Sequence, residues 1–110
     1  MEQVILIYFS PTCDHCKVFT ENMLKQMDKL KNDQLVMISY EDINAVKSFD
    51  DTYKLSGYHN IKIGSEGYTF IVQKYYHIQR FPFVAEYDEY GRLIKTLQGD
   101  LKPEDIAGKL

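Results

Sequence analysis

The two cysteines of the chain, Cys13 and Cys16, stand three positions apart in the stretch "YFSPTCDHCKVF", residues 8–19. They follow an apolar run and occupy the point where a helical pattern begins. Residues three apart are neighbours on a helix surface, so both sulfurs can meet without unwinding the helix. The pair is compatible with a redox couple, with half of a metal site, or with a structural disulfide.

Position along the helix favours redox chemistry and assigns different roles to the two thiols. A thiol at a helix N-terminus lies beside unpaired N–H groups and the positive end of the helix dipole, which favour the reactive thiolate. Cys13 has this place, whereas Cys16 lies one turn further in, on the apolar side of the predicted helix. We predict that Cys13 attacks a substrate disulfide and that Cys16 then resolves the mixed disulfide.

The residues between the cysteines act in opposite directions. A donor N–H of His15 close to Cys13 stabilises its thiolate and makes the disulfide more oxidising, whereas the negative charge of Asp14 opposes this effect. Asp14 also suits the start of a helix, and exposure to solvent is the alternative for His15. The sequence leaves open which of the two governs the reactivity of Cys13.

The other two interpretations of the cysteines have weaker support. A zinc site needs two more ligands, and His59 and His77 are single residues without paired spacing. A structural disulfide across one helical turn closes a very short loop and stabilises little. We therefore expect no metal and no cofactor.

The predicted elements that position the cysteines alternate between strands and helices. Strands are predicted at residues 4–9, 35–40, 60–64, 81–87 and 92–97. Helices are predicted at residues 14–31, from a cap at Glu41 and Asp42 to a stop at Gly57, at 66–76 and at 103–110. This order predicts an α/β fold with a parallel sheet core, right-handed crossovers and a C-terminal antiparallel hairpin that turns at residues 88–91.

The helix predicted at residues 66–76 is rich in aromatic residues. Ser65 is the expected N-cap of this helix. Its apolar side chains have helical spacing, and we expect all of them to face the core: Tyr68, Ile71, Val72, Tyr75 and Tyr76.

Composition restricts the class of protein. The 110 residues are 45% hydrophobic and carry a net charge of −3, with nine Tyr, six Phe and no Trp. This composition is typical of one globular domain, residues 1–110, which is either complete or a piece of a longer protein. The basic residues are scattered, which argues against nucleic-acid binding, and no apolar run is long enough to span a membrane. The N-terminal residues lack the features of a signal peptide, so we expect the chain as given to be soluble. We also expect a monomer.

The chain resembles the thioredoxin-like superfamily along almost its whole length. The resemblance rests on the strand that leads into "SPTCDHC", on "RFPF" at the start of a later strand, on a glycine turn and on a closing helix. It implies a three-layer α/β/α sandwich. In that family a cis proline packs against the disulfide, and the matching residue is Pro82. A cis Pro82 would turn the backbone of Phe81 toward the sulfurs, where an extended substrate segment can pair with it.

The helix–strand insertion between Tyr40 and Pro82 resembles the TlpA/ResA-like branch of thiol–disulfide oxidoreductases. That branch includes cell-envelope reductases that act in cytochrome maturation. The resemblance implies protein disulfides as substrates, an unidentified thiol as electron donor, and a periplasmic or cell-envelope location in preference to the cytoplasm.

The chain departs from the family pattern at several positions. Thr12 stands where the family usually has a Trp, and the first strand and helix of the family are missing, since Val4 already begins the strand before the cysteines. Ile7 stands where cytoplasmic thioredoxins have a buried Asp that accepts a proton. Glu41 or Asp42, at the end of the next predicted strand, is a candidate replacement.

The sequence therefore predicts a thiol–disulfide oxidoreductase with Cys13 and Cys16 as the redox pair. The TlpA/ResA-like resemblance favours a reductase, whereas His15 between the cysteines is similar to disulfide oxidases of the Dsb type. The alternative is a non-catalytic binding or adaptor domain of a larger cell-envelope protein. Such a domain would use the surface of Phe81 and Phe83, which alternation places on one side of their strand.

Overall fold

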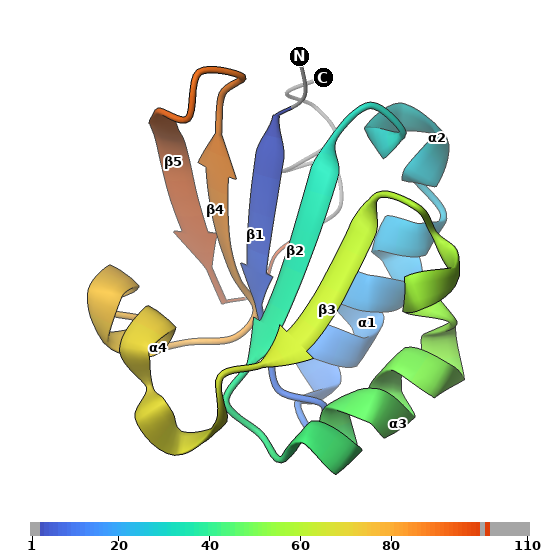
Figure 1. Cartoon of the computed structure of the whole chain (residues 1–110), viewed down its shortest axis with the longest axis vertical. Coiled ribbons are helices and arrows are strands. Elements are labelled where there is room, and N and C mark those ends of the chain that lie inside the picture. Colours follow the sequence, from blue (N-terminus) through green and yellow to red (C-terminus); the bar gives the residue numbers. More distant parts are fainter. Residues whose placement is uncertain (1–2, 100, 102–110) are drawn as a thin grey trace.

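Five strands form one mixed sheet with the most apolar strand at its centre. The computed structural model describes residues 3–99 and 101 of the chain. The strands are β1 (Val4–Tyr8), β2 (Gln34–Ser39), β3 (Ile61–Ser65), β4 (Phe83–Tyr87) and β5 (Leu93–Gln98). Their order in the sheet is β3-β2-β1-β4-β5, and β1, β2 and β3 are parallel while β4 and β5 are antiparallel to their neighbours (Figure 1). The predicted parallel core and C-terminal hairpin are thus confirmed.

The register of the sheet brings three loops to one edge. Tyr8 pairs with Ile38 of the parallel strand β2, so the segments after β1 and β2 leave the sheet side by side. Tyr8 also pairs with Phe83 at the beginning of the antiparallel strand β4. The residues before β4 therefore reach the same edge as the cysteine loop.

The first face of the sheet carries the larger hydrophobic core. Residues at alternate positions of a strand share a face, so Ile5 and Ile7 of β1 point toward the same helices as Leu35 and Met37 of β2. These helices are α1 (Asp14–Leu24), α2 (Met27–Leu30) and α3 (Ile43–Tyr53). Burial of this apolar surface is the main stabilising contribution to the fold.

The second face of the sheet is covered by the short helix α4 (Ile71–Tyr76). Val72 and Tyr76 of this helix pack against Tyr8 and Phe83, which form a separate cluster with Ile78 and Ala85. Figure 1 shows α4 on the opposite side of the sheet from α1 and α3. The layers are therefore those of the predicted α/β/α sandwich.

The helix predicted at residues 14–31 is interrupted. α1 ends at Leu24, Gln26 has non-helical dihedral angles (φ −108°, ψ 11°), and α2 begins at Met27. Met27 and Leu30 are nevertheless buried in the same core as the residues of α1. The apolar spacing continues across the break, which is why the pattern predicted one helix.

The start of α3 agrees with the prediction and its end does not. The Asp42 side chain caps the helix by accepting a hydrogen bond from the Asn44 N–H at 3.0 Å. The helix ends at Tyr53, and the left-handed residue that terminates it is Lys54 (φ 56°). Gly57, the predicted stop, lies in the following 3₁₀ turn, Leu55–Gly57.

The prediction for residues 66–76 is largely wrong. Ser65 belongs to β3, and a 3₁₀ turn and the left-handed Phe70 (φ 54°) precede α4. Tyr68, Ile71 and Tyr75 are 71%, 67% and 73% exposed, so they do not face the core. A helix of six residues presents one narrow side to the sheet, and Val72 and Tyr76 occupy that side.

The hairpin turn has the predicted form. Gly91 adopts a left-handed conformation (φ 81°), and its N–H donates to the Asp88 carbonyl oxygen at 3.0 Å. The helix predicted at residues 103–110 lies outside the described residues. Within residues 3–99, no helix has the length and apolar character needed to cross a membrane.

Candidate active site

Cys13 is the N-cap residue of α1, as the sequence predicts. Its N–H donates to the Ser10 carbonyl oxygen at 3.1 Å, and its own carbonyl oxygen accepts from the Lys17 N–H at 3.1 Å. The side chain is half-buried, and both cysteines carry free thiols. This geometry holds the sulfur of Cys13 at the positive end of the helix, with part of its surface open to a reaction partner.

Cys16 lies one turn further along α1 and is 1% exposed. Burial raises the pKa of Cys16 far above its usual range, because a thiolate is poorly solvated there. A hydrogen bond from the Ser10 backbone lowers this pKa, and the neighbouring Cys13 thiol raises it again. Cys16 therefore keeps its proton while Cys13 faces the surface. The predicted difference in burial is present, and the attacking and resolving roles stay predictions.

The other predicted residues around the cysteines are exposed. Asp14 is in the first turn of α1, with its Oδ1 3.9 Å from the Lys17 Nζ. The Thr12 Oγ1 is 3.1 Å from the Ser10 Oγ. His15 lines a shallow hollow together with Phe81, Arg80 and Gly99, so it lies on the side of the cysteine loop that faces the residues before β4.

Pro82 has the conformation that the resemblance implies. The Phe81–Pro82 peptide bond is cis, and Pro82 is buried at the sheet edge next to the cysteine loop. The Gly99 N–H donates to the Pro82 carbonyl oxygen at 3.0 Å and ties this loop to the end of β5. The structure thus brings Pro82 and Phe81 to the same edge as Cys13.

Phe81 is surrounded by other aromatic rings. Its ring centroid is 5.9 Å from that of Tyr8 and 5.8 Å from that of Tyr40, and Tyr40 in turn lies 5.6 Å from Phe70. Phe83 is 1% exposed. A surface formed by Phe81 and Phe83, as considered for an adaptor domain, is therefore absent, because Phe83 belongs to the core.

A polar group lies on the inner side of the cysteine loop. Ser10 is 3% exposed, and its Oγ donates to the Glu41 Oε2 at 3.3 Å. Burial raises the pKa of Tyr40, a hydrogen bond from Ser10 lowers it, and the negative charges of Glu41 and Cys13 raise it. The Tyr40 hydroxyl therefore lies close to all three of these groups.

Ser10 and Tyr40 were not predicted as site residues, and Glu41 was named only, with Asp42, as a candidate replacement for the missing buried Asp. The available signal was position, because each lies at or just after the C-terminal end of a predicted strand, where loops of parallel strands meet. The residue types did not indicate a functional role, since serine and tyrosine at such positions are usual in turns and cores.

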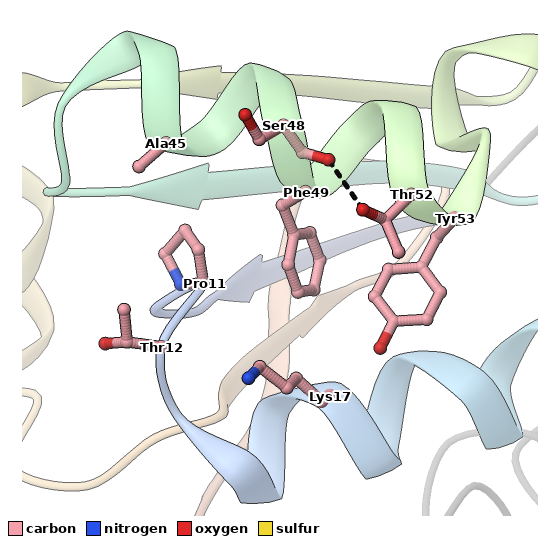
Figure 2. Close-up of a pocket in the computed structure, with 8 residues that line it drawn as sticks. All are labelled: Pro11, Thr12, Lys17, Ala45, Ser48, Phe49, Thr52 and Tyr53. Atoms are coloured by element: carbon pink, nitrogen blue, oxygen red, sulfur yellow. Dashed lines mark hydrogen bonds between the residues drawn. The ribbon is translucent and has the colours of Figure 1, made fainter.

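A groove of about 440 Å³ opens between the cysteine loop and α3. Figure 2 shows Pro11 and Thr12 on one side, Phe49 of α3 facing Pro11, and Lys17 of α1 below. The groove also has hydroxyl groups along α3, including that of Thr52, which donates to the Ser48 carbonyl oxygen at 2.9 Å. It provides space beside the residue that precedes Cys13.

In the described part of the chain, no group of three or more His, Cys, Asp or Glu side chains has the arrangement that a metal ion needs. The groups present at this edge are two thiols, with hydroxyl and carboxylate groups beside them.

Comparisons with known proteins agree with this architecture. The model of a family described as thioredoxin-like domain matches residues 1–110. Among curated proteins, no sequence matches the chain.

Solved structures with the same fold include several proteins of thiol–disulfide chemistry. A secreted Mycobacterium tuberculosis disulfide oxidoreductase, homologous to E. coli DsbE, superposes with a TM-score of 0.81 at 16% identity, over 98% of this chain and 79% of that one. StoA from Bacillus subtilis gives a TM-score of 0.74 at 22% identity, over 97% and 81% of the two chains. A thiol-disulfide isomerase from Corynebacterium glutamicum gives 0.74 at 15% identity, over 99% and 80%. The predicted thioredoxin-like fold is thereby confirmed.

Proposed function

Because the chain belongs to the thioredoxin-like domain family, we propose that it is a thiol–disulfide oxidoreductase that acts on protein disulfides. The observation that carries the proposal is the arrangement of the two thiols: Cys13 is half-exposed at the N-terminus of α1, and Cys16 is buried one turn behind it. The thiol-disulfide names of the structural relatives support the same class of chemistry.

The proposed reaction consists of two thiol–disulfide exchanges. The sulfur of Cys13 attacks one sulfur of the substrate disulfide, whose S–S bond breaks, and the other substrate sulfur leaves with the electron pair and takes up a proton. The sulfur of Cys16 then attacks Cys13 and releases the second substrate sulfur, which is protonated in turn. The substrate leaves as a dithiol, and the protein is left with a Cys13–Cys16 disulfide, which a thiol donor reduces.

The backbone next to Pro82 is the proposed place for the substrate chain. The location of Phe81 at the cysteine edge, where it lines a hollow together with His15, supports this placement. An extended substrate segment would pair with the Phe81 backbone while its disulfide reaches Cys13. Thr12, Asp14 and His15 are exposed around Cys13 and complete the proposed contact area.

We propose the reductase direction and a cell-envelope location. The location is supported by relatives described as secreted or exposed, such as the M. tuberculosis oxidoreductase. His15 supports the opposite direction, because a cationic neighbour favours the reduced, thiolate form. The reduction potential of the Cys13–Cys16 pair, measured against glutathione, decides between the two directions. A potential below that of glutathione supports a reductase, and a potential well above it supports an oxidase.

The proposed roles of the cysteines predict different outcomes for two serine variants. Cys13→Ser should abolish reduction of a model protein disulfide in the presence of a dithiol donor, because no attacking sulfur remains. Cys16→Ser should form a mixed disulfide with the substrate and not release it, which mass spectrometry of the non-reduced protein detects. Thermal unfolding of both variants provides the control for folding. Wild-type activity in a folded Cys13→Ser variant would contradict the assignment.

The second candidate, a non-catalytic binding domain, has support from one surface only. Tyr68, Ile71 and Tyr75 are exposed together around α4. The rate at which Cys13 reacts with iodoacetamide separates the candidates. A rate like that of an unstructured cysteine peptide favours the binding domain, and a much faster rate favours the oxidoreductase.

A further inference from the structure

One arginine lies at the edge of the candidate active site without an acidic partner. Arg80 directly precedes Phe81, whose backbone is the proposed place for the substrate chain. It lines the hollow of about 340 Å³ to which His15 and Gly99 also contribute. In the described part of the chain, no Asp or Glu forms an ion pair with Arg80. Its guanidinium therefore keeps its N–H donors available to a bound molecule.

The backbone around Arg80 is held by the end of β5. The Gln98 Oε1 accepts hydrogen bonds from the Gln79 N–H at 3.0 Å and from the Arg80 N–H at 3.1 Å. The Gly99 N–H donates to the Pro82 carbonyl oxygen at 3.0 Å. The segment that carries Arg80 is thus tied to β5 on both sides, so little conformational freedom is lost when a substrate binds there.

The guanidinium of Arg80 lies against Gly99. A Cβ atom at position 99 would lie 3.2 Å from the Arg80 Cζ and 3.3 Å from its Nη1, closer than ordinary van der Waals contact. Gly99 also has a φ of 96°, a conformation that other residues rarely adopt. Because residue 99 has no side chain, the guanidinium can lie along this wall of the hollow.

The charges around the hollow favour an anion. None of the described residues that line it is acidic. Asp14, which precedes His15, has its Oδ1 3.9 Å from the Lys17 Nζ, so its charge is partly compensated there. A guanidinium prefers carboxylates, because its parallel N–H groups match both oxygens, and the ring of Phe81 offers apolar contact to the methylene groups of a Glu or Asp. The hollow therefore fits an acidic side chain.

We propose that Arg80 makes the protein selective for disulfides flanked by an acidic residue, whose carboxylate binds the guanidinium while the substrate backbone pairs with Phe81. The proposal rests on the proposed function of Cys13 and Cys16 and names a substrate class for it. Successive residues of an extended segment are about 3.3 Å apart, so the acidic residue should lie within one or two positions of the reacting cysteine. Arg80 takes no part in the exchange of electrons and selects which disulfide reaches Cys13.

Competition between two peptides tests this selectivity. The peptides of a pair each carry one cysteine in a mixed disulfide with 2-mercaptoethanol and differ only by Glu or Gln at one position. Separate pairs place this position one or two residues before or after the cysteine. Reduced protein, freed of other thiols, is the limiting reagent, and mass spectrometry measures how much of each peptide is reduced. The ratio of the two products gives the ratio of their kcat/KM values.

The wild-type protein should favour the Glu peptide at the best position. We expect a ratio of about fivefold, the upper range for a solvent-exposed ion pair. The ratio should fall toward unity at about 1 M salt, where the Debye length is about 3 Å. Arg80→Gln should bring the ratio close to unity at low salt. Arg80→Glu should reverse the preference, so that a peptide with Lys at the same position is favoured over the Glu peptide.

Arg92→Gln is the matched control. It removes the same charge at the hairpin turn, at the opposite end of the sheet from the beginning of β4 (Figure 1). Arg92 is already paired, since its Nε donates to the Asp88 Oδ2 at 2.9 Å. This variant should keep the wild-type ratio, which separates the local effect of Arg80 from the effect of net charge.

Each contrary result has a defined meaning. Equal reduction of the Glu and Gln peptides by the wild type at every position would overturn the selectivity, and the proposed function would stand because both peptides are reduced. A preference that persists in folded Arg80→Gln, or that Arg92→Gln loses equally, would also overturn the role of Arg80. Failure of the wild type to reduce any peptide, or wild-type reduction by Cys13→Ser, would instead remove the proposed function on which this role rests.

Discussion

Cys16 illustrates how one environment can determine the role of a side chain. The residue is chemically identical to Cys13, yet burial against the core raises its pKa and prevents direct attack from solvent. It can react only with a sulfur that has already come to its neighbour Cys13. The proposed order of attack and resolution therefore needs only the difference in depth along α1, without any additional residue.

The raised pKa of Cys16 also predicts how the stability of the reduced protein depends on pH. In the unfolded chain this thiol ionises near its ordinary value of about 9, whereas in the folded protein it keeps its proton well above that pH. The unfolded state thus binds fewer protons above pH 9, and the free energy of unfolding should fall by up to about 1.4 kcal/mol per pH unit there. Below pH 9 the contribution of Cys16 is complete and constant.

Denaturant unfolding of reduced protein between pH 8 and pH 11 measures this dependence around the ordinary thiol value of about 9. Reduced Cys16→Ser is the control, because it keeps the tyrosines and Cys13 but has no titrating group at position 16. In this variant the free energy of unfolding should decrease less steeply with pH, because the contribution of Cys16 is missing. Equal slopes in the two proteins would show that Cys16 ionises normally in the folded state.

At the scale of elements, the end of α3 has a lysine where the backbone conformation favours glycine. Lys54 adopts a left-handed conformation (φ 56°) at the C-terminus of the helix, a place where glycine is usual. A side chain in this region costs about 1 kcal/mol. The helix ends there because its last turn is followed by Leu55, which is buried in the core.

Lys54→Gly should therefore stabilise the protein. We expect an increase in the free energy of unfolding of up to about 1 kcal/mol, because glycine reaches the left-handed region without steric cost. Lys47→Gly is the matched control, since Lys47 is exposed in the middle of α3. There the same change should lower the free energy of unfolding by about 1 kcal/mol. Chemical denaturation of both variants distinguishes the two signs, and a destabilised Lys54→Gly would contradict this account of the helix end.

Strands were easier to predict from the sequence than helix boundaries. Apolar and β-branched runs have few alternatives to a buried strand, so residues 4–9 and 35–40 were located almost to their ends. Helical spacing does not report a break when both pieces pack on the same core, as Met23 and Met27 do. It also does not tell which of several aromatic residues faces the sheet, so Tyr68 and Tyr75 were placed wrongly.

At the scale of the whole molecule, the two faces of the sheet contribute unequally. The first face buries residues from three helices in one continuous core, while the second is covered by α4 and its neighbours in a smaller cluster. The cysteines are attached to the first core through Cys16, and the aromatic residues around Phe81 belong to the second face. The candidate active site lies where the two meet.

Substitutions on the two faces should therefore have different costs. Leu35→Ala, in the first core, should lower the free energy of unfolding by about 2–5 kcal/mol. Val72→Ala, half-buried on α4, should cost about 1 kcal/mol or less. Equilibrium unfolding in urea measures both. Similar losses at the two positions would mean that α4 is as important for stability as the larger core.

The sequence predicted the residues proposed to react but not their polar neighbours. Cys13 and Cys16 are recognisable by type and spacing, and Pro82 through the resemblance to the thioredoxin-like superfamily. The contact of Ser10 with Glu41 depends on the register between β1 and β2, which pairs Tyr8 with Ile38. Many registers satisfy the same apolar pattern over so few residues, so this contact needed the three-dimensional structure.

The antiparallel pairing of β1 and β4 has a consequence for how this chain can change in length. Tyr8 pairs with Phe83 at the cysteine edge, whereas Val4 pairs with Tyr87 at the other, so the hairpin turn lies at the end of the sheet remote from Cys13. Insertions in that turn would leave the spacing of the thiols, Glu41 and Pro82 untouched. One added residue within β2 would move Glu41 by a full strand step of about 3.3 Å and turn its side chain away. Related sequences should therefore vary in length at the hairpin turn and keep a constant length between Cys16 and Glu41.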